Sequence, residues 1–149
     1  MDAAHICTPD VVACRRDTSL VEAARLMRDC HVGDLIVVEG AAGDASPVGI
    51  LTDRDVVLAV VAAGVDPATL YVGEVMSTPA VVAYAWEDLW QVAGRMRLHG
   101  VRRMPVIGQT GAMIGVIAFD DLLEAGSNLV ASLCGTAGRQ PYFEQKRRA

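Results

Sequence analysis

The apolar residues in the first third of the chain show two periodicities in succession. Four of them fall at positions i, i+3, i+4 and i+7: Leu20, Ala23, Ala24 and Met27. This spacing predicts a helix over residues 18–30, and Ser19 with Glu22 has the spacing of a capping box at its start. The run 35–38 is short, apolar and rich in β-branched residues, which predicts a buried strand.

The same succession continues and then occurs again. A Gly-, Asp- and Pro-containing loop at 39–47 separates the first strand from a second predicted strand, and Gly64 ends the helix that follows it. The remaining elements, in chain order, are a strand at 48–51, a helix at 53–63, a connector at 64–73, an extended segment at 81–83, a helix at 87–98, strands at 104–107 and 113–118, and a helix from 119 to about 133 with a break near Gly126. Each half therefore follows the order β-α-β-β-α, which predicts an α/β fold.

The two halves are also similar residue by residue. Gly49-Ile50-Leu51-Thr52-Asp53-Arg54-Asp55 is echoed 66 positions later by Gly115-Val116-Ile117-Ala118-Phe119-Asp120-Asp121. The segment 8–12 returns as 78–82. We therefore divide the chain into repeat 1 at 5–66, repeat 2 at 67–133 and a basic C-terminal tail at 134–149. Units this small should pack together as one body, and the seam between them is a natural place for a ligand.

Charge and composition restrict the classes of function. The chain has 149 residues and a net charge of −5, while its last eleven residues carry +3. An acidic body argues against nucleic-acid binding, and no apolar run approaches the roughly 20 residues of a membrane span. The first residues lack the pattern of a secretory signal, so we expect a soluble cytoplasmic protein.

The cysteines and the absent motifs argue against catalysis. Four cysteines without a Cys-x-x-Cys pair favour reduced, mostly buried thiols, and their spacing with the histidines matches no zinc template. The chain has no phosphate-binding P-loop, no Gly-x-Ser-x-Gly elbow and no His-Glu-x-x-His motif. We therefore do not expect an enzyme, and no cofactor is required.

The strand-to-helix junction at Thr52 is the first candidate site. Backbone N–H groups, a hydroxyl and the carboxylate of Asp55 gather there, which suits the phosphate and ribose of a nucleotide. The same spacing is a capping box that needs no ligand. In repeat 2, Ala118 replaces the threonine while Asp121 keeps the carboxylate.

Charged and aromatic side chains outside this junction add further candidates. Arg102 and Arg103 could hold a phosphate bidentately, whereas their counterparts in repeat 1 are Gly33 and Asp34, so the two clefts should differ. The alternative is a solvated surface pair. We assign His31 and His99 to helix ends and Met27, Met96 and Met104 to the core. Trp86 and Trp90, four apart on a helix, are either core residues or an exposed aromatic stripe at an oligomer contact, and we favour the stripe.

The helix spacing Leu-x-x-Ala-x-x-Met, the Val…Val-Val strand and the Gly-apolar-apolar-Thr/Ser-x-x-Asp motif together resemble a tandem pair of CBS (cystathionine β-synthase) domains, over residues 5–133. The segment from Val72 to Pro79 resembles the opening of such repeats. The resemblance implies a Bateman-type module of the free-standing bacterial kind, in which two repeats pack with pseudo-twofold symmetry and two modules form a homodimer. It also implies a regulatory role, signalling the energy or metabolite state to an unknown protein partner.

The ligand implied by the resemblance is an adenosine nucleotide (AMP, ADP or ATP, with NAD or S-adenosylmethionine as further possibilities) between the repeats. It assigns phosphate to Thr52 and ribose to Asp55 and Asp121. The full set of nucleotide-binding candidates is Thr52, Asp55, Asp121, Arg54, Arg103, Thr8, Pro9, Val11, Thr78, Pro79 and Val81. Ala118 departs from the pattern, so one cleft would bind more weakly, bind a different nucleotide or stay empty. A ligand-free dimerisation or scaffold module is the alternative function.

Overall fold

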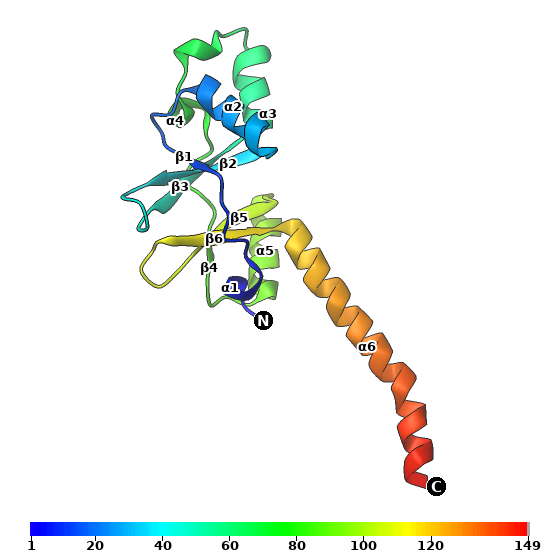
Figure 1. The fold of residues 1–149 in the computed structure, drawn as a ribbon. Coiled ribbons are helices and arrows are strands. Elements are labelled where there is room, and N and C mark those ends of the chain that lie inside the picture. The colour runs from blue at the N-terminus through cyan, green and yellow to red at the C-terminus, as the bar shows by residue number, and fades with distance from the viewer. Residues whose placement is uncertain (149) are drawn as a thin grey trace.

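The computed structural model describes residues 1–148 and consists of two lobes, each built on a three-stranded sheet (Figure 1). The first sheet has the order β1-β2-β3 and the second the order β4-β5-β6. Their bounds are β1 Ala13–Cys14, β2 Asp34–Glu39, β3 Ser46–Thr52, β4 Ala83–Tyr84, β5 Arg103–Ile107 and β6 Met113–Ala118. In each sheet the first pair of strands is parallel and the second antiparallel. The α/β fold and the strands expected from apolar runs are confirmed.

One helix connects the parallel strands of each lobe, α2 (Leu20–Cys30) in the first and α5 (Leu89–His99) in the second. The Ser19 hydroxyl accepts the Glu22 N–H at 3.1 Å, and Asp88 caps α5 in the same way through the N–H groups of Trp90 and Gln91. Both helices end in a left-handed residue, His31 in one and Gly100 in the other. The structure thus places His31 in the backbone conformation that ends helices.

The helices that follow each hairpin differ from the prediction. The helix expected at 53–63 is divided into α3 (Asp53–Val56) and a π-helical turn, η1 (Val57–Val61). The break expected near Gly126 is wrong, because α6 runs without interruption from Phe119 to Arg148. A single helical glycine costs only about 1 kcal/mol relative to alanine, so it does not by itself end a helix.

The short helices that were not predicted from the sequence pack on the lobe formed mainly by the other repeat. They are α1 (Ala3–Ile6), the 3-10 turn η2 (Pro67–Thr69) and α4 (Val72–Val75). The N–H groups of Ala3 and Ala4 donate to carbonyls of repeat 2, at Glu87 and Ala85, so α1 belongs spatially to the second lobe. The α4 helix lies on the first lobe, where the Val72 N–H donates to the Thr18 carbonyl. The division at 66/67 remains a prediction, and the packing crosses it in both directions.

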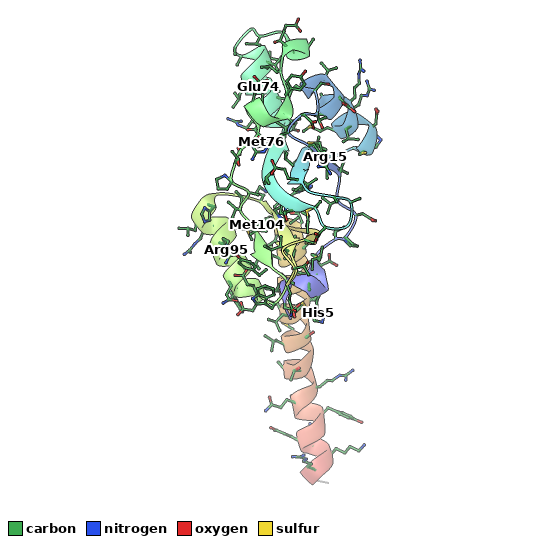
Figure 2. All side chains as sticks on the ribbon, turned by 90° about the vertical axis from the view of Figure 1, so that its left-hand side faces the viewer. His5, Arg15, Glu74, Met76, Arg95 and Met104 are labelled. Carbon is green, nitrogen blue, oxygen red and sulfur yellow. The ribbon has the colours of Figure 1, made fainter. Side chains whose placement is uncertain are left out.

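Each lobe has its own hydrophobic core. Met76, from the α4 segment, is buried with the first sheet, and Met104 is buried in the second (Figure 2). The predicted core positions of Met27, Met96 and Met104 are confirmed. The exchange is visible in these cores, because Ala3 lies in the second core and Val72 in the first.

The helix α6 leaves the second lobe and extends away from both sheets (Figure 1). Leu129, Val130 and Leu133 on this helix are more than half exposed. Within residues 1–148, no helix is both long and apolar enough to cross a membrane. The part of the basic tail that the structure describes is helical as far as Arg148.

Two other predictions need correction. Trp86 and Trp90 are exposed as expected. However, only Trp90 lies on α5; Trp86 lies in the turn before that helix, where its ring stacks on Tyr84. The expectation of mostly buried thiols is wrong. Cys14 is buried and Cys7 half-buried, but Cys30, the last residue of α2, and Cys134, on α6, are both exposed.

Candidate functional site

Two clefts lie between the lobes and occupy equivalent places in the duplicated fold. The larger has a volume of about 720 Å³ and the smaller about 290 Å³. The larger is lined by Gly33, Asp34, Ile50, Thr52, Asp53, Arg54, Ser77, Pro79, Ala80, Val81, Gly100, Val101, Arg102, Arg103, Ala118, Phe119 and Asp120. The smaller is lined by Thr8, Asp10, Val11, Val12, Val32, Asp34, Ile36, Arg103, Val116, Ala118, Asp120 and Asp121.

Backbone pairing explains why each cleft combines both repeats. The linker residue Ser77 pairs with Ile50 of β3, and Thr8 pairs with Val116 of β6 in the same way. The segment 77–81 therefore faces the Thr52 junction, while the segment 8–12 faces the Asp121 junction. This grouping decides which predicted residues can act together.

An ion pair separates the two clefts. Arg103 Nη1 lies 3.2 Å from Asp34 Oδ1, and both residues line both clefts. Burial raises the pKa of Asp34 above its ordinary value; the Arg103 charge and hydrogen bond oppose this, and Asp53 adds to it. The pairing registers place these residues at equivalent positions, because Asp34 lies opposite Thr52 and Arg103 opposite Ala118.

The junction between β3 and α3 forms the predicted capping box. The Thr52 hydroxyl accepts the Asp55 N–H at 3.1 Å, and Asp55 Oδ2 accepts the Thr52 N–H at 2.9 Å. This geometry fits both a ligand-free cap and a nucleotide site, because the cap leaves Thr52 and Asp55 with further hydrogen-bonding groups. The Thr52 hydroxyl keeps its proton for donation, and Asp55 keeps a second carboxylate oxygen.

The equivalent junction in repeat 2 is half as complete. Asp121 Oδ2 accepts the Ala118 N–H at 2.6 Å, but Ala118 has no side-chain acceptor to return the bond. Phe119 replaces the aspartate at the next position, and the Arg102 guanidinium lies over its ring, 5.4 Å from the centroid. A stacked guanidinium keeps its N–H donors in its plane and available.

The predicted site residues divide between the clefts as follows: Thr52, Arg54, Pro79 and Val81 line the larger, Thr8, Val11 and Asp121 the smaller, and Arg103 both. Asp55, Pro9 and Thr78 are not among the residues that line either cleft. The Thr78 hydroxyl donates to the Val48 carbonyl at 2.9 Å, so it holds the linker against the hairpin.

Four carboxylates of the clefts were not predicted as site residues: Asp10, Asp34, Asp53 and Asp120. The alignment of the halves contained a signal for two of them, because Asp34 stands where repeat 2 has Arg103 and Asp120 stands where repeat 1 has Arg54. Recognising their role requires knowing that equivalent residues of the repeats meet at the seam.

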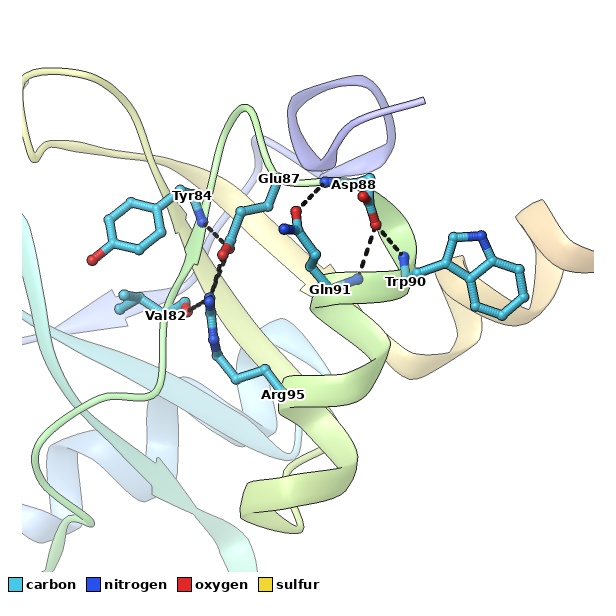
Figure 3. A network of polar contacts seen from close by, with 7 residues as sticks. All are labelled: Val82, Tyr84, Glu87, Asp88, Trp90, Gln91 and Arg95. Atoms are coloured by element: carbon cyan, nitrogen blue, oxygen red, sulfur yellow. Dashed lines mark hydrogen bonds and ion pairs between the residues drawn. The ribbon is translucent and has the colours of Figure 1, made fainter.

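A polar network in repeat 2 lies at the start of α5 (Figure 3). Glu87 accepts the Tyr84 N–H at 2.8 Å and pairs with both terminal nitrogens of Arg95, while Arg95 Nη1 also donates to the Val82 carbonyl at 2.7 Å. Burial raises the pKa of Glu87, but the hydrogen bonds from Arg95 and Tyr84 outweigh it and hold that pKa below its ordinary value. These bonds fix the turn from β4 into α5.

Metal coordination finds no support in residues 1–148, where no group of three or more His, Cys, Asp or Glu side chains could hold an ion.

Comparison with known proteins identifies the duplication. The family model of the CBS domain matches twice, at residues 3–62 and 72–128. The CBS domain-containing protein YhcV of Bacillus subtilis is 36% identical over 115 residues, covering 77% of this chain and 78% of that protein. An uncharacterized protein of Methanopyrus kandleri, MK0525, is 29% identical over 124 residues; the match covers 83% of this chain but only 62% of that protein's length.

Solved structures agree with this fold. The hexameric CBS-CP12 protein from bloom-forming cyanobacteria is 35% identical, with a TM-score of 0.70 over 83% of this chain and 69% of that one. The cytosolic domain of the Mg²⁺ channel MgtE, solved in complex with ATP, is 25% identical, with a TM-score of 0.70 over 83% of this chain and 48% of that one. With two matched copies that span most of its residues, the chain belongs to the CBS domain family as a tandem CBS pair.

Proposed function

We propose that the protein is a regulatory module that binds an adenosine nucleotide between its CBS repeats and transmits the occupied state to a protein partner. The observation that carries this proposal is the larger cleft, which joins an apolar wall to a hydroxyl and three arginines, Arg54, Arg102 and Arg103. The similarity to the MgtE domain solved with ATP supports it.

The dimensions and chemistry of the larger cleft suit a nucleotide. Its volume of about 720 Å³ lies within the range of small-molecule sites, roughly 300–1,000 Å³. Ile50, Pro79 and Val81 offer an apolar surface for the base. The guanidiniums and the Thr52 hydroxyl donate hydrogen bonds, as phosphate oxygens require.

We assign the ribose to the carboxylate of Asp55, as the family resemblance implies, although Asp55 pairs with Thr52 of the larger cleft and does not itself line that cleft in this structure. Its Oδ2 is held by the Thr52 N–H, which leaves Oδ1 as the acceptor for a diol. Asp121 is the equivalent acceptor for the smaller cleft.

Transmission of the bound state needs a second conformation or assembly, because a ligand that binds two states equally shifts neither. We assign this role to a homodimer. Exposed apolar side chains on the helices that follow the hairpins support it: Val57, Leu58, Val61, Phe119 and Leu123. The CBS-CP12 protein, to which this chain is similar, is hexameric, so a related protein forms an assembly of several subunits.

A ligand-free scaffold is the second candidate function. The capping box favours it, because Thr52 and Asp55 have a complete structural role without a ligand. This candidate predicts a thermal midpoint that nucleotides do not change.

A thermal-shift screen with AMP, ADP, ATP, NAD and S-adenosylmethionine, followed by calorimetry, separates the two candidates. Specific binding to the native state raises the midpoint by mass action. Asp55→Ala should weaken the response, and Asp29→Ala, on an exposed part of α2, is the matched control. If no nucleotide changes the midpoint of thermal unfolding, the sensor function is refuted and the scaffold function is supported.

A further inference from the structure

The two clefts occupy equivalent places but differ in charge. Arg54 of the larger cleft corresponds to Asp120 of the smaller, and Ala80 corresponds to Asp10. Arg102 lines only the larger cleft, and Asp121 only the smaller. The larger cleft therefore has equal numbers of arginines and aspartates, whereas the smaller has four aspartates around Arg103.

Size acts in the same direction as charge. The smaller cleft, at about 290 Å³, has less than half the volume of the larger. A phosphate placed there would face Asp10, Asp120 and Asp121, and like charges at close range in a partly buried site are strongly repulsive. Charge and volume thus both oppose a nucleotide phosphate in the smaller cleft.

Arg103 is the cation that the two clefts share. Its bond to Asp34 is 3.2 Å long, and its side chain is 44% exposed, so it can turn toward the larger cleft. There it would join Arg54 and Arg102, and a phosphate dianion would compete with one carboxylate for it.

We propose that the chain binds one phosphate-bearing nucleotide, in the larger cleft only, and that its phosphate takes Arg103 from Asp34. The ion pair is then a latch between the repeats that the ligand opens. This inference rests on the proposed nucleotide-binding function and adds to it the stoichiometry, the cleft and the competing carboxylate.

Calorimetry with ATP and with AMP on the full chain tests the stoichiometry. One ligand per chain is expected, and two would overturn the inference while leaving the sensor function intact. The cleft is tested by filling each cleft from the linker segment that lines it: Ala80→Trp, in the larger cleft, should abolish binding, whereas Val11→Trp, in the smaller, should preserve it. Loss of binding only in Val11→Trp would place the ligand in the wrong cleft and overturn the inference.

The latch is tested by its two members. Arg103→Ala removes charge-assisted hydrogen bonds and should weaken ATP binding about 10- to 100-fold. Asp34→Asn frees Arg103 and should tighten ATP binding several-fold, while changing adenosine binding little. Asp17→Asn makes the same change in net charge at an exposed residue outside both clefts and controls for long-range effects.

The outcomes are distinguishable because these variants change the ligand's affinity without removing its base contacts. Equal affinity for ATP in Asp34→Asn and Asp17→Asn would overturn the latch. Far-ultraviolet circular dichroism and the urea midpoint establish that each variant is folded. If the unsubstituted chain binds none of the nucleotides, the proposed function is refuted, and this inference is refuted with it.

Discussion

The two repeats share their backbone in detail and differ in their charges. Both hairpins have a register shift at the same place, between Val37 and Val38 in one and between Val106 and Ile107 in the other. The N–H of Asp53 donates to the Gly33 carbonyl, and the N–H of Phe119 donates equivalently to Arg102. The backbone scaffold has thus been kept, and side-chain changes at the seam have made the two clefts unequal.

The charge difference has a structural consequence as well as a functional one. Had both repeats kept the same residue at the start of the second strand, two like charges would face each other at the seam. With Asp34 in one repeat and Arg103 in the other, the same geometry gives an ion pair. Divergence therefore relieves a repulsion that exact duplication would impose.

The largest expected effect concerns a feature common to both repeats. A Cβ added to Gly49 would lie 2.7 Å from the Ser77 carbonyl oxygen, and one added to Gly115 would lie 2.7 Å from that of Thr8. Gly49→Ala and Gly115→Ala should each lower the free energy of unfolding by about 1–3 kcal/mol, since the crossing segment must move. Urea denaturation measures the loss.

Gly94→Ala is the matched control, because a Cβ there meets nothing within 4 Å inside α5. It should stabilise by about 0.5–1 kcal/mol. A loss at Gly49 with none at Gly115 would contradict the equivalence of the two crossings.

An effect of comparable size should be confined to repeat 2. Glu87→Ala removes the partner of Arg95 and Tyr84 and should cost about 1.5–3 kcal/mol. Glu39→Ala, which breaks the exposed pair with Arg16 in repeat 1, should cost about 0–1 kcal/mol. Equal losses measured by thermal unfolding would mean that burial does not distinguish the two pairs.

Glu87 also predicts a pH dependence. Since its pKa in the folded chain lies below the ordinary 4.5, its contribution is present above that pH and is lost as the pH falls through the lowered value. The acid limb of a stability-against-pH curve should therefore be shallower in Glu87→Ala. A limb of unchanged slope would exclude this carboxylate as a source of acid sensitivity.

A smaller effect tests the capping difference directly. Thr52→Ala should lose about 0.5–2 kcal/mol as the cap is broken, and Thr52→Ser should retain most of it. Ala118→Thr supplies the missing acceptor at the start of α6 and should gain up to about 1 kcal/mol. Calorimetric unfolding that shows a loss in Ala118→Thr would mean that the junctions differ in backbone as well as in side chain.

The smallest perturbation compares the opening of the two cores by thiol labelling. Burial raises the pKa of Cys14 to about 11, so little reactive thiolate exists at pH 8. Burial also raises the pKa of Cys7, which packs against the second core. Mass spectrometry should find iodoacetamide on Cys30 and Cys134 first, then Cys7, and Cys14 last; early labelling of Cys14 would indicate local opening of the first lobe.

Periodicity predicted the elements that bury their own faces. The helix at α2 and the strands at β2 and β5 carry their signal in consecutive residues, so one sequence was enough. The four-residue helices α1 and α4 are too short to show a period, and they are stabilised by contacts with a distant part of the chain. Their positions could not be predicted from local pattern.

The candidate site was predicted in composition but not in assembly. Thr52, Arg54 and Arg103 were identified from motif and charge, and the structure brings them to one cleft. Which linker faces which junction depends on the exchange of α1 and α4, which has no local signature. In the sequence, Asp34 was noted only because it lacks the positive charge of its counterpart Arg103. Its ion pair with Arg103 spans 69 positions of sequence and has no local signal.

The exchange of end segments also determines how this molecule can be divided. A fragment ending at residue 66 would keep the first sheet but lack Val72 and Met76, which complete its interior. It would still carry Ala3, whose place is in the other half. Two fragments cut at that boundary should therefore each be incomplete in isolation, and mixing them should restore structure in both at once.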